Sequence, residues 1–108
     1  MNLIQAQTIY TTLTNSQHQV LAKSLLKAAV RYARMRVDWY LFDVEQRMEL
    51  DAERTAAHNA FIDTCNIMSR NMAKAGEDIS WRTAISNDRK IIGDFACLLH
   101  AVMGLMAR

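Results

Sequence analysis

In the stretch RTAAHNAFIDTCNIMSRNMAKAG, residues 54–76, apolar residues recur every three or four positions. This spacing places them along one face of an α-helix, where they can pack against neighbouring helices. The apolar positions are Ala57, Phe61, Cys65, Met68 and Met72, and the polar positions opposite are Asn59, Asp63, Asn66, Arg70 and Lys74. Asp51 can cap the start of such a helix, and Lys74 followed by Gly76 is typical of its end. The stretch therefore predicts an amphipathic helix with one buried face.

A longer helix is expected upstream, after a short first helix at residues 2–13. Asn15 or Ser16 can provide its N-cap, and no proline or glycine interrupts the chain before about residue 50. Its apolar residues step by four and three: Leu21, Leu25, Ala28, Tyr32, Met35, Trp39 and Phe42. A second set widens this face: Leu26, Ala29, Ala33, Val37, Tyr40, Val44 and Met48. We predict one unbroken helix that contacts more than one neighbour.

The C-terminal third contains a loop and a final helix. A short helical turn is expected around Trp81, and Asn87, followed by Asp88, can cap the last helix. The apolar stripe of that helix is Ile92, Phe95, Leu99, Val102 and Met106, and small residues recur on its other side at Gly93, Cys97, Ala101 and Gly104. The chain has no proline and 51% apolar residues, which excludes a disordered chain. We predict that residues 1–108 form a single all-α domain, a three- or four-helix bundle with one long helix and mainly antiparallel neighbours.

The cellular compartment is predicted from the termini and the cysteines. Residues 1–15 lack the basic and apolar regions of a secretory signal, and Cys65 and Cys97 are too few for a disulfide framework. The apolar run at residues 95–107 is shorter than the roughly 20 residues that span a bilayer. We expect a cytoplasmic protein with reduced thiols that does not bind a membrane.

A candidate polar site centres on His58, at the border of the apolar stripe of residues 54–76. Arg54 lies one turn earlier and Asn59 follows, and Arg82 and Arg89 from later segments can join them at one end of the bundle. The alternative is a structural, half-buried imidazole bonded to a helix carbonyl or to an acid on a neighbouring helix. The order arginine then histidine also occurs in helical ribonuclease domains, but these separate the two by four to six residues. RTAAH separates them by three, so a divergent ribonuclease-like domain is only a further alternative.

Metal binding and catalysis are not expected. Cys97 and His100 are helical neighbours, but their candidate co-ligands His58 and Cys65 lie roughly 10 Å apart along a helix, too far to share one tetrahedral zinc. Glu45, Glu49 and Glu53 are not accompanied by the Glu-x-x-His pairs of di-iron bundles. No phosphate-binding glycine loop or nucleophile elbow is present. We therefore predict no cofactor, no metal and no enzymatic activity.

Charge is unevenly distributed along the predicted long helix. Residues 1–37 contain bases and no acid, whereas residues 38–53 are rich in acids. The candidate interface consists of Lys23, Lys27, Arg34, Asp38, Leu41, Glu45 and Glu49. Two copies of such a stripe are complementary when they lie antiparallel across a two-fold axis. The alternatives are a solvated face with local ion pairs, and a nucleic-acid footprint on the basic half.

Two segments carry a resemblance to known proteins, RTAAHNAFIDTCNIMSRNMAKAGEDISWR and NDRKIIGDFACLLHAVMGLMAR. Over residues 47–108 the chain resembles a family of small all-helical bacterial proteins, a domain of unknown function associated with Gram-positive bacteria and mobile elements. The resemblance implies a helical fold and a bacterial cytoplasmic setting, and it implies no activity. We predict a non-enzymatic helical interaction module that self-associates as a dimer. The alternative is a nucleic-acid or phosphate-ligand binder that uses the basic half of the long helix.

Overall fold

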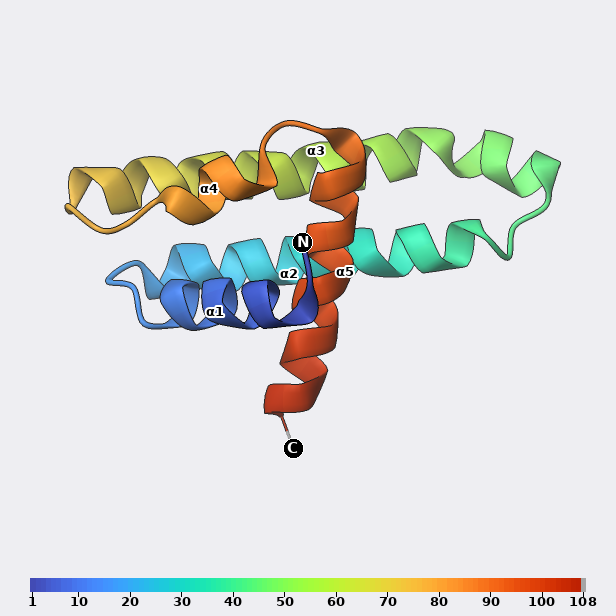
Figure 1. Cartoon of the computed structure of the whole chain (residues 1–108). Helices are drawn as coiled ribbons and strands as arrows, with labels where there is room; N and C mark the ends of the chain where they lie inside the picture. The colour runs from blue at the N-terminus through green and yellow to red at the C-terminus, as the bar shows by residue number, and fades with distance from the viewer. Residues whose placement is uncertain (108) are drawn as a thin grey trace.

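The computed structural model describes residues 1–107 and contains five helices. They are α1 (Leu3–Thr14), α2 (Gln19–Trp39), α3 (Val44–Lys74), α4 (Ser80–Ile85) and α5 (Arg89–Met106). Figure 1 shows α2 and α3 as an antiparallel hairpin, α5 crossing that hairpin near its middle, and α1 and α4 beside one half of it. The predicted all-α fold is confirmed. None of the helices within residues 1–107 has the length and apolarity to cross a membrane.

Side-chain caps explain where three of the helices begin. Asn2 accepts a hydrogen bond from the backbone N–H of Gln5 at the start of α1. Asp43 does the same for Gln46 at 2.8 Å, and the Gln46 side chain accepts a bond from the backbone N–H of Asp43 at 3.0 Å. Such reciprocal capping satisfies amides that the first turn of a helix leaves without partners. Asp88 caps α5 through two backbone amides, one residue after Asn87, which is the cap expected from the sequence.

The predicted single helix over residues 15–50 is wrong. α2 ends at Trp39, a short connection reverses the chain, and α3 begins at Val44. Asp43 is therefore the N-cap of α3, and Asp51 lies exposed within that helix rather than at its start. The expected cap of α2 is also wrong, because Asn15 ends α1 and α2 begins after His18, which makes no side-chain cap.

The core lies where α5 crosses the α2–α3 hairpin. The predicted stripe of α3 is buried: Ala57, Phe61, Cys65, Met68 and Met72. The Phe61 ring lies 5.8 Å from the Phe95 ring of α5 and 6.4 Å from the Tyr32 ring of α2, measured between centroids. Trp81 in α4 is also buried, whereas Met106 at the end of the α5 stripe is exposed, contrary to the prediction. One aromatic side chain thus connects the three longest helices.

A glycine and an arginine meet at the crossing of α2 and α5. Arg36 donates a hydrogen bond from Nη1 to Asp94 Oδ1 at 2.8 Å. A Cβ atom added at Gly93 would lie 2.8 Å from Cζ of Arg36, so any larger residue must displace the guanidinium. A Cβ atom added at Gly104 would have no neighbouring atom within 4 Å. The close approach expected from the small residues of α5 therefore occurs at Gly93 and not at Gly104.

These surroundings predict opposite outcomes for the same substitution at the two glycines. Gly93→Leu is expected to lower the free energy of unfolding by about 1 kcal/mol, because leucine displaces the Arg36 guanidinium from Asp94 and its better helix propensity offsets part of the loss. Gly104→Leu is expected to leave it unchanged or to raise it by up to about 1 kcal/mol, because leucine favours a helix more than glycine does. Urea denaturation of both variants measures the difference. Equal stability of the two variants would contradict the close contact at Gly93.

Candidate interaction surface

The end of the α2–α3 hairpin is the most unusual surface of the molecule. Figure 1 shows this end projecting beyond α5, away from α1 and α4. We call residues 37–48 the hairpin tip. Its exposed apolar side chains are Val37, Tyr40, Leu41, Val44 and Met48, each between 57% and 80% exposed. Solitary exposed apolar residues are ordinary, but a group of this size on one projecting element is typical of an interaction site.

Contacts with α3 hold the tip in place without help from the other helices. The guanidinium of Arg54 lies over the Trp39 ring, with Cζ 4.6 Å from the ring centroid, and that of Arg47 lies at 6.0 Å. Arg47 Nε also donates a hydrogen bond to the Trp39 carbonyl oxygen at 3.0 Å. The Phe42 ring meets the Trp39 ring edge to face at 6.2 Å. Cation–π contacts and aromatic pairs of this kind contribute about 0.5–1.5 kcal/mol each, so they favour the observed conformation of the tip.

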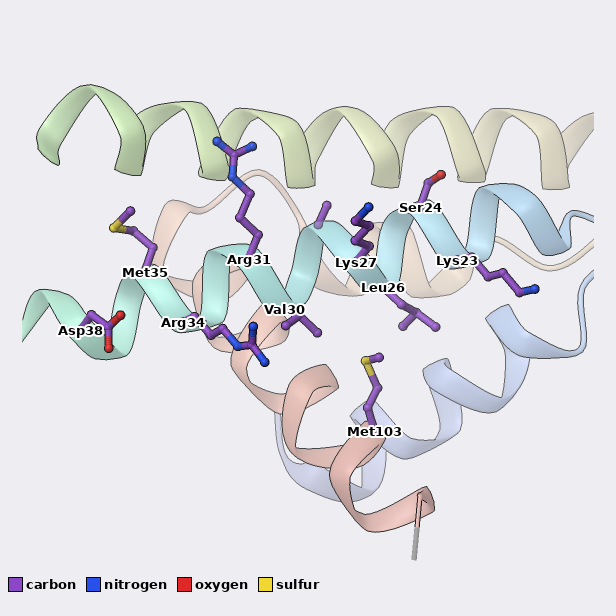
Figure 2. Close-up of a pocket in the computed structure, with 11 residues that line it drawn as sticks. Lys23, Ser24, Leu26, Lys27, Val30, Arg31, Arg34, Met35, Asp38 and Met103 are labelled. Carbon is purple, nitrogen blue, oxygen red and sulfur yellow. The ribbon is translucent and has the colours of Figure 1, made fainter.

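A basic groove runs along the outer side of α2, next to the C-terminal part of α5. Its volume is about 960 Å³, and Figure 2 shows its lining residues. Leu26, Val30 and Met103 supply apolar surface. The bases of the groove are Lys23, Lys27, Arg31 and Arg34, and the acid is Asp38. From the first base to the last the groove extends roughly 16 Å along the helix axis.

The charges of the groove and of the tip take part in no ion pair within residues 1–107. Among residues 1–107 the ion pairs are His18 with Glu77 and Arg36 with Asp94. The four groove bases take part in neither pair, and nor do the acids of the tip region: Asp38, Asp43, Glu45 and Glu49. The local ion pairs expected for a solvated face are therefore not among the ion pairs of residues 1–107.

The structure rearranges the predicted interface. Lys23, Lys27, Arg34 and Asp38 lie on α2, Leu41 lies in the connection, and Glu45 and Glu49 lie on α3, which runs in the opposite direction. The expectation of one continuous stripe on one helix is wrong, because the chain turns back after Trp39. Four exposed apolar residues of the tip were placed in the buried face by the sequence analysis: Val37, Tyr40, Val44 and Met48. The signal that could have corrected this is Asp43-x-x-Gln46, a capping box.

The residues of the predicted polar site are not gathered in one place. Arg54 is engaged with Trp39, and Arg82 donates from Nε to Asn66 Oδ1 at 3.0 Å. Asn66 lies two turns beyond His58 on α3, roughly 12 Å along the helix axis. Arg89 is exposed in the first turn of α5. A pocket that combines all five predicted residues is therefore not formed.

His58 is half-buried, but its predicted hydrogen-bond partners are not found. Its ring lies edge to face on the Tyr32 ring, 5.3 Å between centroids. Nδ1 lies 3.3 Å from Oδ1 of Asn59 on the same helix, in place of the expected carbonyl or acid. Nε2 is buried and has no partner within the described chain. His58 packs as an aromatic side chain between α2 and α3.

The thiols and acids offer little for metal or nucleophilic chemistry. Burial raises the pKa of the Cys65 thiol to about 12, so the nucleophilic thiolate is scarce at neutral pH. Within residues 1–107, no three His, Cys, Asp or Glu side chains are close enough together to hold a metal ion. The groove and the tip are thus the two features whose chemistry suits binding.

Comparisons with known proteins leave the function to be inferred from these two surfaces. No protein-family model, no curated protein and no solved structure matches the chain.

Proposed function

We propose that this protein is a non-enzymatic helical interaction module that self-associates through the hairpin tip. The observation that carries the proposal is the group of five exposed apolar side chains on residues 37–48. Covering this group with a second protein surface removes apolar area from water, which is the main source of binding free energy in such contacts. The acids beside it fit the polar rim that commonly surrounds an apolar interface centre.

The contacts within the tip support the same proposal. Trp39, Arg47 and Arg54 fix the connection before any partner arrives. A pre-formed surface loses less conformational entropy on binding than a flexible one, so more of the contact free energy appears as affinity. The resemblance of residues 47–108 to small helical bacterial proteins supports a bacterial cytoplasmic setting for this association.

A nucleic acid or another phosphate ligand is the second candidate. The unpaired bases of the α2 groove favour it, because phosphate contacts by lysine and arginine supply most of the affinity for nucleic acids. Asp38 in the groove and the acids of the tip oppose it by repelling phosphate. The groove also offers apolar surface, which suits a protein helix better than a phosphate backbone.

Sedimentation equilibrium across a series of concentrations tests the proposed self-association. We expect the mass to rise from 12.3 kDa toward twice that value as the concentration increases. A single 12.3 kDa species up to about millimolar concentration would overturn the proposal. A parallel series with a single-stranded oligonucleotide tests the second candidate, for which a complex that weakens steeply with added salt is expected.

A further inference from the structure

We propose that the hairpin tip of one copy docks into the α2 groove of a second copy, and that the second copy returns the same contact. This inference rests on the proposed self-association and identifies the surface that receives the tip. It replaces the single complementary stripe expected from sequence with two different surfaces that fit each other.

The groove has the chemistry of a receptor for an acidic, apolar element. Leu26, Val30 and Met103 can contact apolar side chains, while the bases of α2 stand beside them. Figure 2 shows Lys23, Lys27 and Arg34 spread along α2, and Leu26 and Val30 on the side of α2 that faces Met103 of α5. An occupant should therefore present apolar side chains in the centre and carboxylates at its edges.

The tip has the chemistry of that occupant. Tyr40, Leu41 and Met48 are among its exposed apolar side chains. Glu45 and Glu49, four residues apart in the first turns of α3, provide carboxylates beside them. These acids and the groove bases have no ion-pair partner within residues 1–107, so contact between copies would satisfy both sets.

A two-fold axis makes the two contacts equivalent. The groove spans residues 23–38 of α2 and the tip begins at residue 37, so the two surfaces share Asp38 at the end of one helix. When two α2 helices lie antiparallel, Arg34 of each copy comes opposite Asp38 of the other. Lys23 and Lys27 then approach the first turns of α3 in the second copy. An interface of this kind closes at two subunits.

Charge reversal in two separate variants tests this arrangement. The groove variant carries Lys23→Glu, Lys27→Glu and Arg34→Glu, and the tip variant carries Asp38→Lys, Glu45→Lys and Glu49→Lys. Each variant alone places like charges at both contacts, so we expect its self-association to weaken about tenfold or more at low salt. An equimolar mixture is expected to form a heterodimer. In it the reversed groove meets the reversed tip, and the unmodified groove meets the unmodified tip. Native mass spectrometry distinguishes the heterodimer by its mass.

A control for the groove variant makes the same net charge change, three bases to glutamate, but leaves both surfaces intact. Arg70→Glu, Lys74→Glu and Lys90→Glu alter exposed bases outside the groove and the tip, and this variant should associate like the unmodified protein. Circular dichroism verifies the fold, and the single reversals Lys27→Glu and Glu49→Lys replace any triple variant that loses helix. Unchanged association of the groove or tip variant, or no heterodimer in the mixture, overturns the docking proposal while leaving self-association intact. A monomeric unmodified protein would instead refute the proposed function.

Discussion

Replacement of Phe61 with alanine is expected to lower the free energy of unfolding by about 3–5 kcal/mol, as for other large aromatic residues in protein cores. Phe61 is fully buried and its ring meets those of Tyr32 and Phe95, so its removal leaves a cavity at the point where α2, α3 and α5 converge. Domains of this size commonly have a total stability of about 5–15 kcal/mol. The variant should therefore unfold at a much lower urea concentration.

The half-buried Phe42 provides the matched control. Its ring meets only that of Trp39 among the aromatic side chains of the described chain, and it lies in the projecting tip rather than in the core. Phe42→Ala should cost about 1–2 kcal/mol, well below the loss at Phe61. Urea titrations followed by circular dichroism measure both values. Similar losses at the two positions would show that the core is not centred on the crossing of α5.

Much of the fold could be predicted because burial leaves a periodic trace in the sequence. Ala57, Phe61, Cys65, Met68 and Met72 repeat at helical spacing, and all five are buried as expected. The positive φ of 75° at Gly76 also matches the local rule for a helix end, and the cap of α5 at Asp88 lies one residue from the expected Asn87. These features depend on a few neighbouring residues, so sequence alone is sufficient to place them.

The turn between α2 and α3 could not be placed by the same reasoning. Apolar residues continue at helical spacing across the turn, in one set through Trp39 and Phe42 and in a second through Tyr40, Val44 and Met48. No glycine or proline marks the reversal, and its local signal is the pair Asp43 and Gln46. Periodicity reports that a residue lies on a helix face, but not whether another element covers that face.

The five residues of the candidate polar site are not brought together in the structure, for a related reason. Arg54 and His58 are one turn apart on α3, and their proximity follows from helix geometry alone. The position of Arg82 depends instead on how α4 packs beside α3, and the structure places it against Asn66, Ser86 and Asn87. Contacts between distant segments need the tertiary arrangement, which no local pattern supplies.

The exposed tip gives the prediction with the largest functional effect. Leu41→Ser together with Met48→Ser is expected to weaken self-association about a hundredfold or more. Full burial of each apolar side chain is worth about 1.5–3 kcal/mol, and each 1.4 kcal/mol corresponds to a tenfold change in the dissociation constant. Both side chains are already exposed in the monomer, so the free energy of unfolding measured at low concentration should change by less than about 0.5 kcal/mol.

A loss of self-association without a loss of folding stability distinguishes residues of an interface from residues that support the fold. Ile4→Ser with Ile67→Ser serves as the control, because these two exposed aliphatic residues lie on α1 and α3 outside the tip and the groove. The control should dimerise like the unmodified protein in sedimentation equilibrium, while the protein with Leu41→Ser and Met48→Ser remains at the monomer mass. Equal association of all three proteins would remove the tip from the interface. A large loss of stability in the double serine variant would show that Leu41 and Met48 are covered within the monomer, contrary to their exposure in the structure.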